Sequence, residues 1–341
     1  MDMLTSTRIV LLGKTGAGKS SLGNTIFGED VFNISHSSMS EASQPRAETK
    51  QVKGKRTTLI DTRSVLDTCR SDELLKADIV RCITECAPGP HAFLIVLKVE
   101  KYTKQEKEVI EKICEYFSED ALKYAVVVFT HGDQLPEGIT IEKFVSQNKD
   151  LDELVKKCGG RCHVVDNKYW KDNKENVYRT NHYQVAELLK TIDKIGGEND
   201  REYFTNDMLE DVKRQIETEE EHIKEAAGNM SQEDIRNTAK TSVFEELLTR
   251  LAGAAAGVLL GAFLDAAKIV KLDNFQGLLN VRALASTATG GTLVQALGSG
   301  GVQGGHIGYQ AAEGAKSPLE AVKKATGAVW NNSSGPGGAK R

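Results

Sequence analysis

Short runs of apolar residues alternate with helix-like stripes through the first part of the chain. The runs predict buried strands at 8–12, 56–60, 92–97, 125–129 and 162–165. Apolar positions three and four residues apart predict helices at 20–27, 74–83, 103–117 and 183–195. This alternation indicates an α/β domain with a mostly parallel sheet and helices on both faces.

The pattern becomes purely helical after Gly196-Gly197. One apolar stripe predicts an amphipathic helix that packs on the preceding domain, and its members are Phe204, Met208, Val212, Ile216 and Ile223. Ser231-Gln-Glu-Asp234 has the residues of a helix cap and predicts the start of a second helix, whose apolar face carries Ile235, Ala239, Val243 and Leu247. Residues 251–264 and 283–312 then carry no charge, and the second run contains eight glycines.

These changes of composition predict a domain organisation. We expect an α/β domain at 1–197, an amphipathic helical extension at 198–246, a hydrophobic Gly/Ala-rich segment at 247–315 and a polar tail at 316–341. Together they predict an α/β fold followed by an α-helical C-terminal extension.

Composition and charge exclude some classes of protein. The chain has 341 residues, of which 40% are hydrophobic and 27% charged, as in a folded globular protein. The net charge of −4 gives no basic field for nucleic acid. All six cysteines fall in the first half, behind a short polar start, so we interpret them as reduced thiols of a cytoplasmic protein. Cys158-x3-Cys162-His163 departs from the usual zinc spacing and is interpreted as packed thiols.

The most specific motif lies between the first predicted strand and helix. Gly13-Lys14-Thr15-Gly16-Ala17-Gly18-Lys19-Ser20, followed by Ser21, fits the phosphate-loop pattern at every fixed position. Its glycines let backbone N–H groups turn toward phosphate oxygens, and the helix N-terminus adds positive charge. Lys19 is expected to reach the phosphates, and the Ser20 hydroxyl is expected to bind Mg²⁺.

A carboxylate supports the metal assignment. Asp61 ends the second predicted strand, where a P-loop site needs an acidic group facing Mg²⁺. On its own such a residue would be an ordinary turn aspartate. Beside the phosphate loop it is predicted to be the second metal residue.

A different motif indicates which base binds. Thr130-His131-Gly132-Asp133 follows the strand at 125–129. A carboxylate there can accept hydrogen bonds from N1–H and the 2-amino group of guanine, whereas adenine would leave it unpaired. His131 could lie flat against the base. The alternative is a plain polar turn.

Several segments together resemble one protein family. They are Arg8-Ile-Val-Leu-Leu-Gly-Lys-Thr-Gly-Ala-Gly-Lys-Ser20, Gly23-Asn24-Thr25-Ile26-Phe27-Gly28, Ile60-Asp61-Thr62, Pro88-Gly-Pro-His-Ala-Phe-Leu-Ile-Val-Leu97 and Thr130-His131-Gly132-Asp133. Over about residues 6–200 the chain looks like the immunity-associated GTPases (GIMAP, or immune-associated nucleotide-binding, family), specifically their fish-type members. The resemblance implies a G domain that binds GTP or GDP with Mg²⁺, and Asn167 as the last base contact. It also implies self-association through the nucleotide face, action on intracellular membranes and a role in immune cells.

Departures from the family's pattern bear on hydrolysis. The family usually has Asp-Thr-Pro-Gly where this chain has Asp61-Thr62-Arg63-Ser64. The switch hydroxyl expected near Mg²⁺ is replaced at Ala42, although Ser40 or Ser43 could substitute. No Gln follows Ser64 to orient a water, and Lys101 stands where some members have Arg. Nucleotide binding is therefore expected to be intact and GTP hydrolysis slow, which leaves open whether the protein acts as an enzyme.

The uncharged tail admits three interpretations. Gly253, Gly257 and Gly261 share one helical face, which permits close helix packing. The run at 251–264 is about 21 Å long as a helix, less than a bilayer core of about 30 Å. Peripheral contact of 247–315 with intracellular membranes, packing within or between chains, and disorder remain open.

Three functions compete. The favoured one is a nucleotide-controlled, self-associating scaffold with slow hydrolysis. The alternatives are an active GTPase stimulated by dimerisation, and a P-loop ATPase or small-molecule kinase.

Overall fold

The computed structural model describes residues 6–33, 46–62, 72–100, 107–170 except 109, 112, 114 and 115, 177–199, 202–226, and 230–265 except 252, 253 and 255. Several sequence predictions lie outside these residues. They concern the helix start at 103–106, the switch residues 40–43, Arg63, Ser64, Lys101, most of the Gly/Ala-rich segment and the tail at 316–341.

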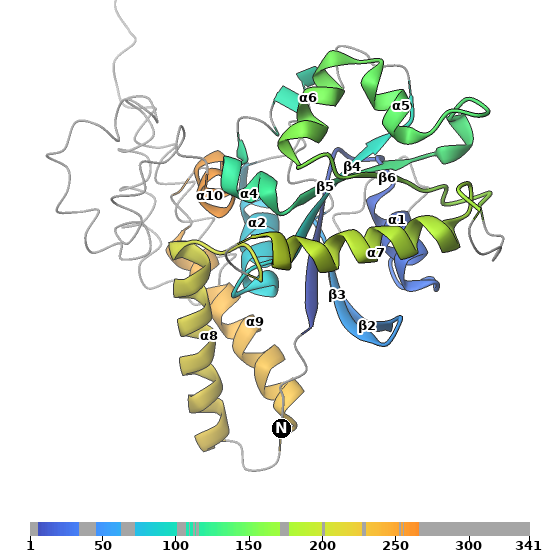
Figure 1. Ribbon diagram of the computed structural model, residues 1–341. Coiled ribbons are helices and arrows are strands. Elements are labelled where there is room, and N and C mark those ends of the chain that lie inside the picture. The colour runs from blue at the N-terminus through green and yellow to red at the C-terminus, as the bar shows by residue number, and fades with distance from the viewer. Residues whose placement is uncertain are drawn as a thin grey trace, which may run out of the picture. The chain divides into compact units, whose positions relative to one another are not determined.

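A six-stranded sheet forms the first part of the structure, in the order β2-β3-β1-β4-β5-β6 (Figure 1). The strands are β1 (Thr7–Leu12), β2 (Arg46–Val52), β3 (Lys55–Asp61), β4 (Ala92–Lys98), β5 (Ala125–Thr130) and β6 (Cys162–Val164). All neighbours pair in parallel except β2 and β3, which pair antiparallel. Every residue of β5 is buried, so both faces of the sheet are covered. The predicted α/β fold with a mostly parallel sheet is confirmed, and β2 is an edge strand that the sequence pattern did not reveal.

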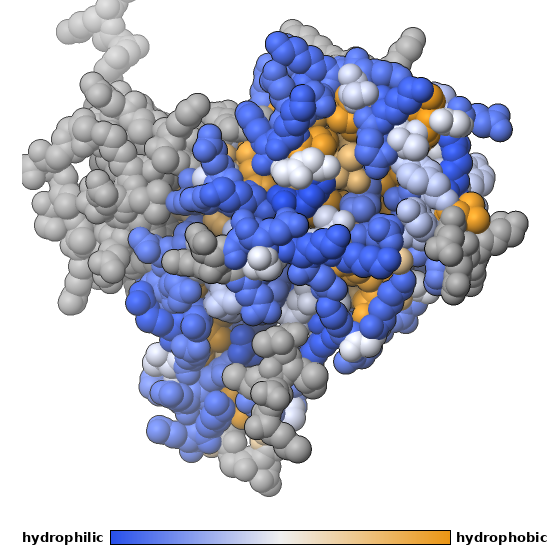
Figure 2. Space-filling view, viewed as in Figure 1, coloured by the Kyte–Doolittle hydropathy of each residue, from blue (hydrophilic) through white to orange (hydrophobic). Residues whose placement is uncertain are grey.

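Helices connect the strands. They are α1 (Lys19–Phe27), α4 (Glu119–Lys123), the 3₁₀ turn η1 (Gly132–Gln134), α5 (Ile141–Ser146), α6 (Lys149–Lys157) and α7 (Asn181–Glu198). Side chains cap several of them: Asn148 accepts from two backbone N–H groups at the start of α6, and Thr180 accepts from that of Tyr183 in α7. On the face shown, hydrophilic residues predominate and hydrophobic ones form small separate patches (Figure 2).

The motif Gly23-Asn24-Thr25-Ile26-Phe27-Gly28 holds the chain that leaves α1. The Asn24 side chain accepts from the backbone N–H of Phe32 at 2.7 Å and donates to its carbonyl at 2.9 Å. The Phe32 ring stacks on Phe27, and a Cβ on Gly23 would lie only 2.6 Å from that ring. Gly28 ends the helix in the left-handed conformation, φ 73°. The motif therefore anchors the backbone at Phe32, after the end of α1.

The segment Pro88-Gly-Pro-His91 binds the chain that follows α7. The backbone N–H of Phe204 donates to Pro90 O at 2.9 Å, and the Phe204 ring packs edge-on against Phe93. A Cβ on Gly89 would collide with the carbonyl of Phe204. The prediction that Phe204 belongs to an amphipathic helical stripe is wrong, because its ring and backbone are held here and the helix begins only at Asp207.

His91 stabilises the same corner as a neutral base. Its Nδ1 accepts from the backbone N–H of Arg8 at 3.0 Å, and its ring lies near Tyr203. Burial, followed by the positive charge of Arg8, lowers the pKa of His91 to about 3. The imidazole therefore remains an acceptor at neutral pH.

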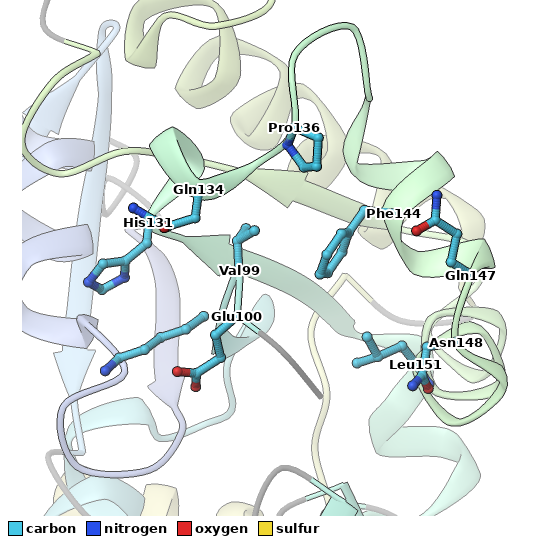
Figure 3. Close-up of a pocket in the computed structure, with 10 residues that line it drawn as sticks. Val99, Glu100, His131, Gln134, Pro136, Phe144, Gln147, Asn148 and Leu151 are labelled. Carbon is cyan, nitrogen blue, oxygen red and sulfur yellow. The ribbon is translucent and has the colours of Figure 1, made fainter. Parts of the chain in front are cut away.

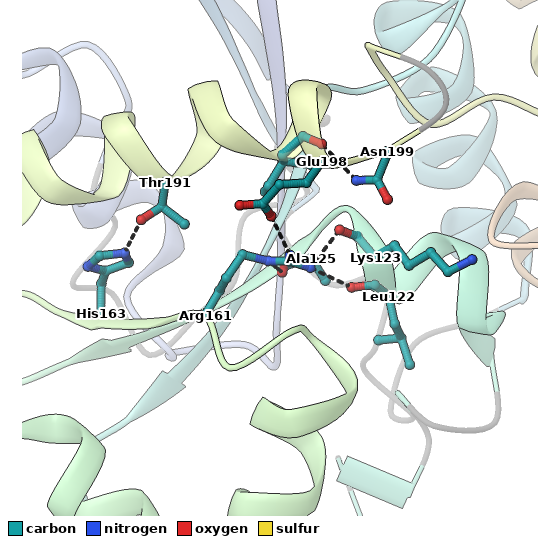
Figure 4. Close-up of polar contacts among 9 residues, drawn as sticks. Leu122, Lys123, Ala125, Arg161, His163, Thr191, Glu198 and Asn199 are labelled. Atoms are coloured by element: carbon teal, nitrogen blue, oxygen red, sulfur yellow. Dashed lines mark hydrogen bonds and ion pairs between the residues drawn. The ribbon is translucent and has the colours of Figure 1, made fainter.

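Arg161, just before β6, joins several elements (Figure 4). Its guanidinium donates to Ala125 O at 3.1 Å and to Leu122 O at 3.3 Å, and lies 3.6 Å from the Glu198 carboxylate of α7. Nearby, the His163 ring is 2.9 Å from the Thr191 hydroxyl. These contacts connect the start of β5 to α7.

The chain divides into two compact units, 1–70 with 85–206, and 71–84 with 207–341. The described helices of the second unit are α8 (Asp207–Ala226), α9 (Gln232–Arg250), α10 (Ala256–Phe263) and α2 (Asp72–Cys86), whose last two residues belong to the first unit. α8 packs on α9, whose predicted face is buried as expected: Ile235, Ala239, Val243 and Leu247. The predicted cap is also present, since Ser231 Oγ accepts from the backbone N–H of Asp234 at 3.1 Å.

An ion pair, a cation–π contact and buried apolar side chains also stabilise the second unit. Arg236 pairs with Glu220 at 3.2 Å, and Arg81 of α2 lies 4.0 Å from the ring centre of Phe244. In α10, Leu259 and Phe263 are buried. Among the described helices, none combines the length and the apolar character that crossing a bilayer requires.

Candidate functional site

The loop between β1 and α1 closes around one lysine. Lys19 is 5% exposed, and its ammonium donates to Gly13 O at 2.8 Å and to Lys14 O at 3.0 Å. Gly13 has no space for a side chain, because a Cβ would lie 2.5 Å from Val96 O. Gly18 adopts φ 88°. The sequence thus places a buried cation inside a glycine loop at a helix N-terminus, as a phosphate site requires.

The tip and the rear of the loop differ in exposure. Thr15 and Gly16 are exposed, and Gly16 has φ 78°. Ala17 is buried, and its N–H donates to Lys14 O at 3.1 Å. Ser21 lies half-buried in the first turn of α1. The exposed tip leaves the outer edge of the loop accessible to a ligand.

The two predicted metal residues lie together. Ser20 Oγ donates to Asp61 Oδ2 at 2.5 Å, and Asp61 is fully buried. The next residue, Thr62, donates its hydroxyl to Leu11 O at 2.7 Å, which ties the end of β3 to β1. A hydroxyl and a carboxylate oxygen are hard ligands of the type that Mg²⁺ prefers, so the residues present fit this ion.

Thr130 joins the phosphate loop to the predicted base motif. Its hydroxyl donates to Ala17 O at 2.8 Å and lies 3.0 Å from His131 Nδ1. His131 is exposed and adopts the left-handed conformation, φ 59°. That conformation turns the chain sharply at the end of β5, directly before η1.

Gly132 and Asp133 follow in η1. A Cβ on Gly132 would lie 2.7 Å from the Trp170 ring, so the turn packs directly on that indole. The Gly132 N–H donates to Val165 O at 3.0 Å. Asp133 is exposed, and its Oδ2 accepts from the Gln134 side chain at 2.7 Å. An exposed carboxylate on a braced turn is suited to accept hydrogen bonds from a ligand.

Asn167 lies against the phosphate loop from the other side. Its Oδ1 accepts from the Thr25 hydroxyl of α1 at 2.8 Å. A Cβ on Gly18 would lie 3.2 Å from its Nδ2. Thr25 thus occupies the amide oxygen, and the amide nitrogen lies beside Gly18, at the end of the phosphate loop. Sequence reasoning named Thr25 only as part of the motif at 23–28 and missed its contact with Asn167, because nothing in the motif indicates a partner so far away in the sequence.

Sequence reasoning also missed Asp166. This carboxylate is 2% exposed and accepts from the backbone N–H groups of Asp133 at 3.2 Å, Lys168 at 2.9 Å and Tyr169. Burial opposes ionisation, but the hydrogen bond from the Tyr169 N–H, one with the Asp133 side chain, and those from the Lys168 and Asp133 N–H groups together outweigh it and lower the pKa of Asp166. The only signal in the sequence was an aspartate directly before Asn167 at a strand end.

A cavity of about 620 Å³ borders the base motif (Figure 3). His131 and Gln134 line it on one side, and Phe144 and Leu151 from α5 and α6 lie on the other. Glu100, also in its lining, lies 3.5 Å from Lys14 of the phosphate loop. The cavity therefore adjoins both predicted ligand-binding loops.

The structure brings the predicted site residues to one edge of the sheet, where the parallel strands end. The phosphate loop follows β1, Asp61 ends β3, the base motif follows β5, and Asn167 follows β6. Open α/β sheets bind ligands at this edge. Their individual roles stay predictions.

The strand order, the glycine loop between β1 and α1, and the strand-end carboxylate define a P-loop G domain. The profile of the AIG1 family matches residues 7–223, more than half of the chain. The chain therefore belongs to the AIG1 family and carries a GTP-binding G domain of the type found in that family.

Similar proteins have related names. The chain is 35% identical over 226 residues to immune-associated nucleotide-binding protein 8 of Arabidopsis thaliana, covering 64% of this chain and 60% of that protein. It is 33% identical over 202 residues to GTPase IMAP family member 8 of Mus musculus, covering 59% of this chain and 28% of that protein. The chain thus spans less than two thirds of these relatives. Its narrower placement among fish-type members stays a prediction.

Among solved structures, the chain is similar to Toc33 from Arabidopsis thaliana in complex with Mg²⁺ and GMPPNP. The TM-score is 0.45 with 20% identity, over 58% of this chain and 87% of that chain. It is also similar to Era in complex with MgGDPNP and ribosomal RNA, with a TM-score of 0.40, 19% identity and 56% coverage of each chain.

Proposed function

We propose that this protein binds GTP and GDP with Mg²⁺ at the edge of the sheet formed by β1, β3, β5 and β6. The observation that carries the proposal is the juxtaposition of a phosphate-type site with a base-type site. Ser20 and Asp61 lie 2.5 Å apart beside the glycine loop, and Thr130 joins that loop to the turn that carries Asp133. Relatives named as nucleotide-binding proteins and GTPases support the same assignment.

Each group has a chemical task in this proposal. Backbone N–H groups of residues 13–20 and the Lys19 ammonium neutralise phosphate charge. Ser20 and Asp61 hold Mg²⁺, which neutralises further charge on the phosphates. The Asp133 carboxylate accepts from N1–H and the 2-amino group of guanine, and the Asn167 amide nitrogen donates to O6. His131 covers one face of the base.

In this proposal the bound nucleotide controls the state of the protein, which acts as a self-associating scaffold and hydrolyses GTP slowly. No Gln follows Ser64 to orient a water, and Ala42 lacks the expected switch hydroxyl, for which Ser40 or Ser43 could substitute. Intrinsic hydrolysis is therefore expected at or below roughly 10⁻³ per second, the scale of unassisted small GTPases. The alternative is a GTPase that a second copy stimulates, in which case the rate rises with protein concentration.

The resemblance to the immunity-associated GTPases extends the proposal to assembly and location. We infer self-association through the G domain, a cytoplasmic location and peripheral contact with intracellular membranes through 247–315. The buried side chains of α10, such as Leu259 and Phe263, favour packing over lipid contact within 256–264. The membrane contact then depends on residues beyond 265.

Binding of fluorescent GDP and GTP to the full-length protein tests the phosphate and metal assignments. Lys19→Ala and Ser20→Asn should each weaken Mg²⁺-nucleotide binding by at least about tenfold, because charge-assisted phosphate and metal contacts are lost. Lys190→Ala is the control, since that exposed lysine of α7 pairs only with Glu187 among the contacts described. The Ser20→Asn defect should vanish when EDTA removes Mg²⁺ from both proteins. Unchanged affinity in both variants would reject the site.

A further inference from the structure

A buried carboxylate lies between the two predicted base-binding loops without being exposed to a ligand. Asp166 is 2% exposed. Its Oδ2 accepts from the backbone N–H of Asp133, and its Oδ1 accepts from that of Lys168. Asp166 thus touches the loop of Asp133 and the loop of Asn167 at once.

The backbone of Asp166 is itself held from both sides. Asn181, at the start of α7, accepts from the Asp166 N–H at 3.0 Å and donates to the Asp166 carbonyl at 2.6 Å. The neighbouring Val165 carbonyl accepts from Gly132 at 3.0 Å. Hydrogen bonds therefore hold this strand end on both sides, and the Asp166 carboxylate links it to the turn that carries Asp133.

The chemistry of this position requires a carboxylate. Both oxygens accept backbone N–H groups, and only an ionised carboxyl offers acceptors at both atoms. An Asn at 166 would keep one acceptor and turn an NH₂ group toward one of the two sets of donors. The hydrogen bonds lower the pKa of Asp166, so it is an anion at neutral pH.

We propose that Asp166 is the positioning residue for guanine specificity: it orients Asp133 and Asn167 and does not itself touch the nucleotide. The proposal rests on the proposed guanine-binding function. Asp133 and Asn167 contact the base in this proposal, and Asp166 determines how well they select it by fixing their positions. Loss of this carboxylate should therefore impair recognition of the base more than recognition of the phosphates.

Three nucleotides distinguish a loss of base recognition from a loss of phosphate recognition. GTP offers N1–H and the 2-amino group to Asp133, ITP offers N1–H alone, and ATP offers neither, while all three share the same phosphates. In the full-length protein, Asp166→Asn should weaken GTP binding by at least about tenfold and ATP binding by less than about threefold, with ITP between them. A purely structural role would weaken all three equally.

Two further variants complete the design. Asp166→Ser retains a hydroxyl that can accept from Lys168 and Tyr169 but is too short to reach Asp133, so it should show the same selective loss. Ile192→Val removes one buried methyl group in α7, away from both loops, and should leave all three affinities in their wild-type ratios.

The outcomes distinguish the two proposals. If the wild type binds GTP no tighter than ATP, the proposed function fails. If the wild type prefers GTP and both Asp166 variants keep that full preference, the role of Asp166 is refuted while guanine binding stands. If neither variant folds, amide hydrogen exchange in the wild type decides. A slowly exchanging Asp133 amide supports the proposal, and exchange at the rate of an open loop overturns it.

Discussion

Replacing Asp133 by Asn should change the base that the protein prefers. The side chain keeps its size, but one carboxylate oxygen becomes an NH₂ donor. That donor would face the 2-amino group of guanine, which is also a donor. Xanthine carries a carbonyl at this position, so the variant should favour XTP over GTP.

The structure sets the size of the effect. Two hydrogen bonds to a charged acceptor are worth about 1.5–3 kcal/mol each. Asp133 is exposed, and its Oδ2 already accepts from the Gln134 side chain. Binding of guanine must displace water and this side chain, which reduces the net free energy that the two hydrogen bonds contribute. A net loss of about 2–4 kcal/mol follows, which corresponds to about 30-fold to several-hundred-fold weaker GTP binding.

Competition against a fluorescent guanine nucleotide measures both effects in one assay. Asp120→Asn, an exposed carboxylate at the start of α4, is the control and should bind like the wild type. The reasoning is refuted if Asp133→Asn binds GTP within about threefold of the wild type, or if XTP binds the variant no better than GTP.

Two further predictions concern stability. The lowered pKa of His91, about 3 against 6.5, means that the unfolded chain binds a proton that the folded chain excludes. The contribution of His91 to the free energy of unfolding is therefore fully present above about pH 6.5. Between about pH 6.5 and pH 3 it falls by up to about 1.4 kcal/mol for each pH unit. His91→Asn, which retains an acceptor for Arg8, should flatten the acid limb of urea-unfolding data, and an unchanged slope would contradict the assignment. Gly23→Ala should lower the free energy of unfolding by about 1–2 kcal/mol, because the added Cβ lies 2.6 Å from the Phe32 ring and overpacking outweighs the better helix propensity. Phe32→Leu in the same chain should restore part of the loss, and greater stability of Gly23→Ala alone would count against this packing.

The fold of the first unit, 1–70 with 85–206, could be predicted from sequence because its central strands are buried on both faces. Such strands appear as continuous apolar runs, and 125–129 is the clearest of them. β2 was missed for the opposite reason: Arg46–Val52 is an edge strand of mixed polarity, and its pairing depends on the Lys53–Gly54 turn with β3. A local pattern does not contain that pairing.

The residues of the candidate site also fall into those that the sequence revealed and those that it did not. Motifs with fixed spacing, such as the glycine loop, revealed Lys19 and Ser20, since the spacing itself encodes the loop geometry. Thr25 and Asp166 act through contacts 142 and 33 residues away in sequence, and no local spacing records them. Phe204 was misassigned because a helical stripe and an aromatic residue packed beside Pro90 have the same apolar signature.

The grouping of α2 with the C-terminal helices also lay beyond sequence reasoning. Its stripe of Ile79 and Val80 indicates only that one face is buried. Arg81 lies over Phe244, more than 160 residues later in the chain. A hydrophobic face predicts burial but does not name its partner.

The most direct test of the account is the preference of the unmodified full-length protein for its base. Equilibrium competition with GTP, GDP, ATP and ADP in the presence of Mg²⁺ measures it in one experiment. The account predicts that the guanine nucleotides bind at least about a hundredfold tighter than the adenine nucleotides, because adenine leaves Asp133 without a donor. Equal affinity for GTP and ATP would contradict it and favour a P-loop ATPase or kinase.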